Sequence, residues 1–104
     1  MASGKKTYSS VKSIFAKDFK DPAFLIHYEE ERSRSQLALA VSQARQAAGL
    51  TQAELAAKVQ TTQSVISRLE TGKDTRTPSL PLLARIAAAT GKQLVVGFEP
   101  AHGI

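Results

Sequence analysis

The sequence predicts an all-α fold: a five-helix domain preceded by a helical N-terminal extension and followed by one short β-strand. Apolar residues recur at the three- and four-residue spacing of a helix in segments 36–46, 51–59, 62–71 and 80–90. Residues 93–99 instead alternate between two faces, as in a strand, and the sequence offers no other strand candidate. The predicted fold is therefore helical, with a single strand near its C-terminal end.

Capping residues predict where these helices begin and end. Gly49 is expected to end the first in a left-handed conformation. Thr51 and Glu54 have the spacing of a capping box, in which each side chain bonds to the backbone N–H of the other. Thr62 and Ser79 precede the next two helices and are suitable N-cap residues. The inward faces are expected to form the core, from Leu37, Val41, Ala44, Leu55, Ala56, Val59, Val65, Ile66, Leu69, Leu82, Leu83, Ile86 and Ala87.

Length and composition limit the class of protein. The chain has 104 residues, which corresponds to one small domain with an appendage. It has no cysteine, which excludes disulfides and thiolate chemistry and fits a reducing cytoplasm. No apolar run is long enough to cross a membrane and no signal-peptide pattern is present, so a cytoplasmic protein is expected. The net charge of +5 favours a polyanionic partner, nucleic acid before membrane.

The sequence contains no recognisable catalytic motif. Ser64 and Ser67 have no base beside them on their helical face, and His27 and His102 lie far apart in the sequence. No phosphate-binding loop and no pair of suitably spaced acids is present. We therefore expect a protein that is not an enzyme and that holds no metal and no cofactor.

Residues 61–72, TTQSVISRLETG, have one apolar and one polar helical face. The pattern predicts two short helices joined by a tight turn, and the second helix has hydrogen-bonding side chains on its outer face. This arrangement is typical of a motif that places its second helix in the major groove of DNA. Glutamine and arginine can pair bidentately with adenine and guanine. The basic charge of the chain favours this interpretation over a merely solvated face. The polar face consists of Gln63, Ser64, Ser67, Arg68 and Thr71.

Residues 50–73, LTQAELAAKVQTTQSVISRLETGK, resemble the helix-turn-helix of the Cro and lambdoid phage repressor (XRE) family. The resemblance rests on the leading Thr-Gln, the ELA, the TTQ and the LE-x-GK ending, and it extends over about residues 37–91. It implies that Gln63, Ser64 and Arg68 read bases, with Ser67 beside them. It also implies contacts to the DNA backbone, from Gln52 at the start of the first motif helix and from Thr62 and Lys73.

Two features of the motif concern its structure. The resemblance implies that Arg45 and Glu70 form a partly buried ion pair, which joins the first helix to the end of the recognition helix. The family usually has glycine after the apolar residue of the turn, whereas Gln60 follows Val59 here. A left-handed Gln60 would carry strain of about 1 kcal/mol or more. The alternative is a slightly different turn, which would change the pitch of the recognition helix.

Residues 1–34 are predicted to be a separate segment from the helix-turn-helix domain, residues 35–104. The first 28 residues contain every aromatic side chain except Phe98. Asp21 and Pro22 are expected to start a new helix. Aromatic anchors on a charged, weakly hydrophobic segment are typical of folding on a protein partner, and packing on the chain's own domain is the alternative. The predicted anchors are Val11, Ile14, Phe15, Phe19, Phe24 and Tyr28.

Residues 19–56, from FKDPAFLIHYEEE to AAGLTQAELA, resemble HigA-type antitoxins of bacterial type II toxin–antitoxin modules. The resemblance rests mainly on Asp21, Pro22, Phe24 and Tyr28 and on their distance from AAGLTQ. It implies a HigB toxin partner of the RelE superfamily, an mRNA-cleaving endonuclease, and repression of the module's own operon. A stand-alone phage-type repressor and a HipB-like repressor are the alternatives.

The strand predicted at residues 93–99 needs a partner strand. The economical partner is the same strand of a second copy, paired antiparallel across a two-fold axis. Such a homodimer would bind a palindromic DNA operator. The alternative is a tail that packs on its own domain. The residues expected to dimerise are Leu94, Val95, Val96 and Phe98.

Overall fold

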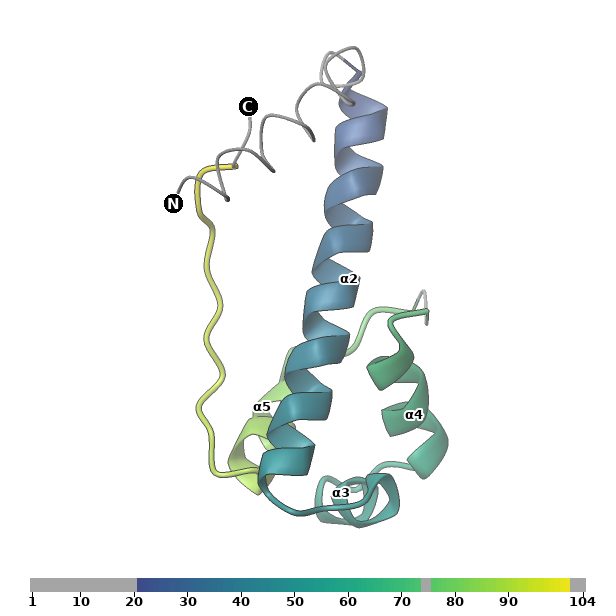
Figure 1. Ribbon diagram of the computed structural model, residues 1–104, viewed down its shortest axis with the longest axis vertical. Coiled ribbons are helices and arrows are strands. Elements are labelled where there is room, and N and C mark those ends of the chain that lie inside the picture. Colours follow the sequence, from purple (N-terminus) through teal and green to yellow (C-terminus); the bar gives the residue numbers. More distant parts are fainter. Residues whose placement is uncertain (1–20, 74–75, 102–104) are drawn as a thin grey trace, which may run out of the picture. The chain divides into compact units, whose positions relative to one another are not determined.

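The computed structural model describes residues 21–73 and 76–101 (Figure 1). These residues form four helices: α2 (Pro22–Ala47), α3 (Gln52–Lys58), α4 (Gln63–Thr71) and α5 (Leu80–Ala89). The described residues divide into two compact units, of which the first is Arg32–Val95 and the second takes in described residues before Arg32 and after Val95. The first unit holds the hydrophobic core and the helix-turn-helix, so it is the unit that positions the candidate site.

The structure differs from the prediction of five helices and a C-terminal strand. Across residues 21–73 and 76–101 there are four helices and no strand. The helix expected at 36–46 and the one expected to start at Asp21 are a single helix, α2, because no glycine or proline interrupts the chain between Pro22 and Gly49. Residues 92–101 form no regular element in the single chain. The backbone N–H and C=O groups of a strand need hydrogen-bond partners on a second strand, and the described residues include no second strand.

The start of α2 agrees with the prediction. The helix begins at Pro22, whose missing N–H costs nothing at the first helical position. An Oδ1 atom of Asp21 accepts a hydrogen bond of 3.0 Å from the backbone N–H of Ala23. The backbone oxygen of Asp21 accepts the first helical bond, from Leu25, at 3.1 Å.

The caps predicted for the other helices are also confirmed. Thr51 and Glu54 form a capping box: the Thr51 hydroxyl accepts from the Glu54 N–H at 3.0 Å, and Glu54 Oε1 accepts from the Thr51 N–H at 2.8 Å. The Thr62 hydroxyl accepts from the N–H of Val65 at 3.3 Å, and the Ser79 hydroxyl accepts from that of Leu82 at 3.1 Å. Each bond satisfies an N–H that has no partner inside its own helix.

The core lies in the first unit and is built from all four helices. Leu55, Val59 and Ile66 are completely buried, which places α3, the turn after it and α4 around one apolar centre. Most of the predicted core residues lie in this cluster or pack against it. Its buried members are Val41, Leu55, Ala56, Val59, Ile66, Leu82 and Ile86. Ala38 and the Thr90 hydroxyl, which bonds to the Ile86 carbonyl at 2.8 Å, are buried as well, although the sequence pattern did not single them out.

The C-terminal end of α4 lies against α2. Gly72 caps α4 in a left-handed conformation with φ of 72°. A Cβ atom placed on Gly72 would lie 3.4 Å from the Cβ of Ala38 and 3.8 Å from the backbone oxygen of Arg34. Glycine therefore serves two purposes here, since it adopts the left-handed conformation without strain and keeps the approach to α2 open.

None of the helices described, within 21–73 and 76–101, is long and apolar enough to cross a membrane.

Candidate nucleic-acid interface

Helix α4 carries its apolar and polar side chains on separate faces. Ile66 is fully buried, and Val65 and Leu69 pack against the core. Gln63, Ser64 and Arg68 are exposed, and Ser67 is half-buried beside them. These four polar residues together line one shallow depression on the surface of the helix. The structure thus brings together four of the five residues that the sequence assigned to the polar face. The fifth, Thr71, does not line the depression, and its hydroxyl donates to the backbone oxygen of Arg68 at 2.8 Å.

The residues expected to contact the DNA backbone lie at or next to the ends of α3 and α4. Gln52 is the first residue of α3, and its side chain is half-buried. Thr62 is exposed at the start of α4, where its hydroxyl is already the N-cap. Lys73 is exposed just after the end of α4. Hydrogen-bonding groups of Gln52 and Thr62 therefore sit at helix N-termini, where the backbone N–H groups and the helix dipole favour phosphate.

An ion pair fixes α4 to α2. Nε of Arg45 donates to Oε2 of Glu70 at 2.6 Å, and Nη2 donates to Oε1 at 2.9 Å. The third arm of the guanidinium, Nη1, donates to the backbone oxygen of Leu50 at 2.8 Å. The side chains of Arg45 and Glu70 are 14% and 6% exposed. The bidentate geometry and the burial make this pair a structural link between the two helices.

Glu70 also contacts the residue expected to bind phosphate. Nε2 of Gln52 donates to Oε1 of Glu70 at 3.2 Å. Burial by itself would raise the pKa of Glu70, but the hydrogen bonds from Arg45 and Gln52 and the charge of Arg45 outweigh it and lower the pKa. The hydrogen bond to Glu70 raises the pKa of Arg45 above its already high value. Both groups are therefore charged at neutral pH, and Glu70 orients the Gln52 amide.

The turn between α3 and α4 contains the residue that departs from the family pattern. Gln60 adopts φ of 61°, which makes it the one non-glycine residue with positive φ in the described part of the chain. The backbone N–H of Thr61 donates to the oxygen of Ala56 at 2.9 Å, and that of Gln60 donates to Ala57 at 3.3 Å. The left-handed turn of the family is thus formed without glycine, and the alternative turn geometry does not occur.

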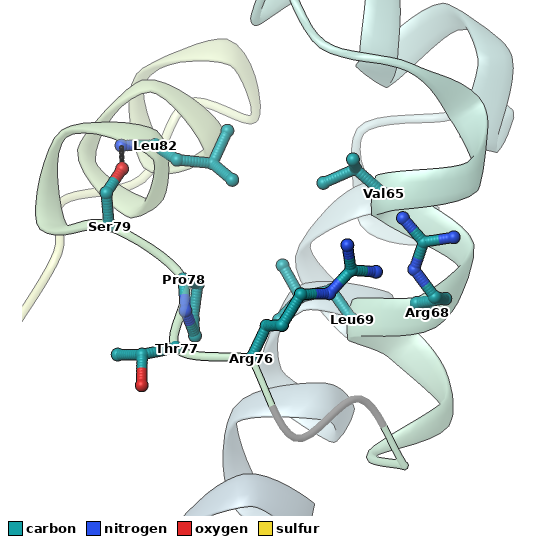
Figure 2. A pocket seen from close by; sticks show the side chains of 8 residues that line it. All are labelled: Val65, Arg68, Leu69, Arg76, Thr77, Pro78, Ser79 and Leu82. Carbon is teal, nitrogen blue, oxygen red and sulfur yellow. Dashed lines mark hydrogen bonds between the residues drawn. The ribbon is translucent and has the colours of Figure 1, made fainter.

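A second hollow lies beside the first, between α4 and the loop that leads to α5 (Figure 2). Val65, Leu69 and Leu82 contribute apolar side chains to it. Figure 2 shows the side chain of Arg76 extending from the loop toward α4, where Arg68 lies. The hollow is lined by Val65, Arg68, Leu69, Arg76, Thr77, Pro78, Ser79 and Leu82. Sequence reasoning gave Arg76 no role, and its only signal is a positive charge in the loop after Lys73.

The residues predicted to contact protein partners are described in part. Val11, Ile14, Phe15 and Phe19 lie outside the described residues. Phe24 is half-buried, and its ring stacks on that of Tyr28 with centroids 6.3 Å apart. Leu94 is half-buried, whereas Val95, Val96 and Phe98 are highly exposed in the single chain.

Comparison with protein families agrees with this geometry. Residues 41–96, more than half of the chain, match a family model described as helix-turn-helix. The chain belongs to this helix-turn-helix family, which is of the XRE type. The fold and the family together define a DNA-binding transcriptional regulator. No curated protein and no solved structure matches the chain.

Proposed function

We propose that two copies of this chain bind a palindromic DNA operator and repress transcription from it. The observation that carries the proposal is the division of α4, because its exposed polar residues line one depression while Ile66 anchors the opposite face in the core. A helix held in this way can enter the major groove without disturbing the domain. The net charge of +5 favours association with the DNA backbone.

Within this proposal the residues divide into two groups. Gln63, Ser64 and Arg68 read base edges, since their donors and acceptors are exposed and Arg68 can pair bidentately with guanine. The second group contacts phosphates and positions the helix without reading sequence. It consists of Gln52, Thr62 and Lys73, with Ser67 at the edge of the base-reading group.

The dimer forms through residues 94–98 in this proposal. Val95 and Phe98 are 86% and 104% exposed in the single chain, and the segment forms no regular element by itself. Antiparallel pairing with a second copy would satisfy its backbone and bury these apolar side chains. A two-fold axis would then present two copies of α4 to successive turns of the major groove.

Selection of duplexes from a random-sequence library tests the proposal. The selected DNA is expected to contain two inverted half-sites whose centres lie about 10 to 10.5 base pairs apart. Deletion of residues 93–104 is expected to leave a folded monomer that binds this DNA weakly, as measured by ultracentrifugation and gel shift. Selection of no common sequence would contradict the base-reading role, and a dimer that survives the deletion would contradict strand pairing.

We also propose that residues 1–34 bind and neutralise a RelE-like toxin of the HigB class. The observation that favours this second function is the exposure of apolar side chains in the first turns of α2, where Ile26 is 62% and Tyr28 is 38% exposed. Such side chains are suited to a protein partner. In a stand-alone repressor, the alternative, the same segment would serve oligomerisation or respond to a ligand.

Calorimetry with the product of a neighbouring toxin gene tests this second function. Tyr28→Ala and Phe24→Ala together are expected to weaken the toxin complex by about two orders of magnitude or more, because a loss of about 1.4 kcal/mol at each anchor corresponds to tenfold in affinity. The same variant should bind the operator as well as the wild type does, since neither residue belongs to the core cluster. Unchanged toxin affinity would favour the stand-alone repressor.

A further inference from the structure

The turn of the helix-turn-helix is contacted by a residue from the last helix. Nε of Arg85, in α5, donates a hydrogen bond of 3.1 Å to the backbone oxygen of Val59. Val59 is the C-cap of α3 and is completely buried. Carbonyl groups at the end of a helix have no N–H partner inside it and need one from elsewhere. Arg85 supplies that partner from a segment 26 residues away in the sequence.

The carbonyl that Arg85 holds belongs to the peptide group that precedes Gln60. The orientation of this peptide plane is coupled to the φ angle of Gln60, which is 61°. On the other side of Gln60, the N–H of Thr61 is held by the oxygen of Ala56 at 2.9 Å. A residue in such an unfavourable conformation persists only when its surroundings fix it from several directions. Hydrogen bonds therefore hold the backbone on both sides of Gln60.

We propose that Arg85 is a positioning residue for DNA recognition, which acts through the Val59 carbonyl to keep Gln60 left-handed and so sets the angle at which α4 leaves the turn. The inference rests on the proposed reading of DNA by α4. A glycine in place of Gln60 would adopt the same φ without strain and would need no such support. In this proposal, the hydrogen bond from Arg85 offsets the strain of a left-handed glutamine at position 60.

The proposal predicts an effect on DNA binding from a residue that need not touch DNA. When the guanidinium is removed, Gln60 can relax toward a right-handed conformation, and Thr62 and the first residues of α4 move with it. Gln63 and Ser64 lie in that first turn. Misplacement of base-reading groups weakens the cognate complex more than the random one, because phosphate contacts tolerate small shifts better than base contacts do.

A double-mutant cycle between Arg85 and Gln60 tests the proposal. Affinity for the library-selected duplex and for a random duplex of equal length is measured for the wild type, Arg85→Met, Gln60→Gly and the double variant. Arg85→Met is expected to lose about tenfold in affinity for the selected duplex, the size of one hydrogen bond. In the Gln60→Gly background the same substitution should lose less than about twofold, since the strain is absent. Lys92→Met, at an exposed position after α5, is the matched control for the lost charge, and it should weaken both duplexes alike.

Amide hydrogen exchange without DNA gives a second readout at Thr61. Its exchange should accelerate by about tenfold or more in Arg85→Met and remain unchanged in Lys92→Met. Arg85→Gln, with the same expected results, replaces Arg85→Met if the latter does not fold. Equal losses of affinity in the two Gln60 backgrounds, or unchanged exchange at Thr61, would overturn the proposal. A wild type that does not discriminate between the duplexes would overturn the proposed function instead, and the exchange rates would still decide the role of Arg85.

Discussion

Replacing Arg45 with methionine tests the ion pair that joins α2 to α4. The substitution keeps most of the aliphatic side chain but removes three hydrogen bonds, two to Glu70 and one to the oxygen of Leu50. Only 6% of the Glu70 side chain is exposed, and its carboxylate keeps the 3.2 Å hydrogen bond from Gln52 but loses its cation. An uncompensated charge in such a place is costly.

The burial of the Arg45–Glu70 ion pair determines how much stability the substitution removes. An exposed ion pair contributes about 0 to 1 kcal/mol, whereas breaking a buried pair by removing one partner costs about 3 to 5 kcal/mol. Exposures of 14% and 6% place Arg45 and Glu70 in the second category. For a domain of this size, about 1 kcal/mol shifts the melting temperature by roughly 4 to 8 °C. Arg45→Met should therefore lower the melting temperature by at least about 12 °C.

Thermal unfolding followed by far-UV circular dichroism measures this change. The control is Arg45→Met combined with Glu70→Leu, which removes both charges and replaces them with apolar groups. That double variant should be more stable than Arg45→Met alone, because no buried carboxylate remains without its cation. A drop of less than about 4 °C for the single variant would show that the pair behaves as an exposed one. A double variant less stable than the single one would also refute the reasoning.

Three other predictions concern pH, the turn and DNA recognition. Because the folded pKa of Glu70 is lowered, the stability that its ionised form contributes should be fully present above its unfolded pKa of about 4.3 and be lost as the pH falls through the lower folded pKa. The difference in unfolding free energy between the wild type and Glu70→Gln should accordingly shrink in urea titrations below about pH 4, and a constant difference would contradict this. Gln60→Gly should raise the urea midpoint by the equivalent of about 1 kcal/mol or less, as left-handed strain is relieved against a greater loss of backbone entropy. A lowered midpoint would mean that the strain at Gln60 is smaller than the entropy cost of glycine there. Arg68→Ala should cost about 1 to 3 kcal/mol on the selected duplex and little on random DNA in gel shifts, whereas Gln52→Ala should weaken both, and equal losses for Arg68→Ala would count against base reading.

Interactions between residues close in the sequence were predictable. The Thr51 and Glu54 capping box and the Thr62 cap depend only on a three-residue spacing, and the structure contains them as expected. The two faces of α4 follow from the helical period in the same way. Local patterns therefore gave the motif and the division of its surface.

Features that depend on packing were not predictable from the pattern. The sequence pattern did not predict the continuity of α2, because the concentration of aromatic residues in the first 28 positions indicated a boundary after residue 34. Such a difference in composition does not break a helix that lacks glycine and proline. The bond from Arg85 to Val59 depends on where α5 lies relative to the turn, and no spacing encodes that position. The predicted strand is also absent from the described residues of the single chain, because a strand forms only when a partner strand lies beside it.

The separation of the two faces of α4 has a consequence for how binding preference can change. Ile66, the Thr62 cap and the left-handed Gly72 at the C-cap hold the helix, and none of them belongs to the four polar residues that line the depression. Substitutions at exposed positions usually change stability by no more than about 0.5 kcal/mol. Gln63 and Ser64 can therefore be exchanged for other polar residues while the core that holds α4 stays intact. Under the proposed base reading, the preference for a DNA sequence can therefore change while the core that holds α4 stays the same.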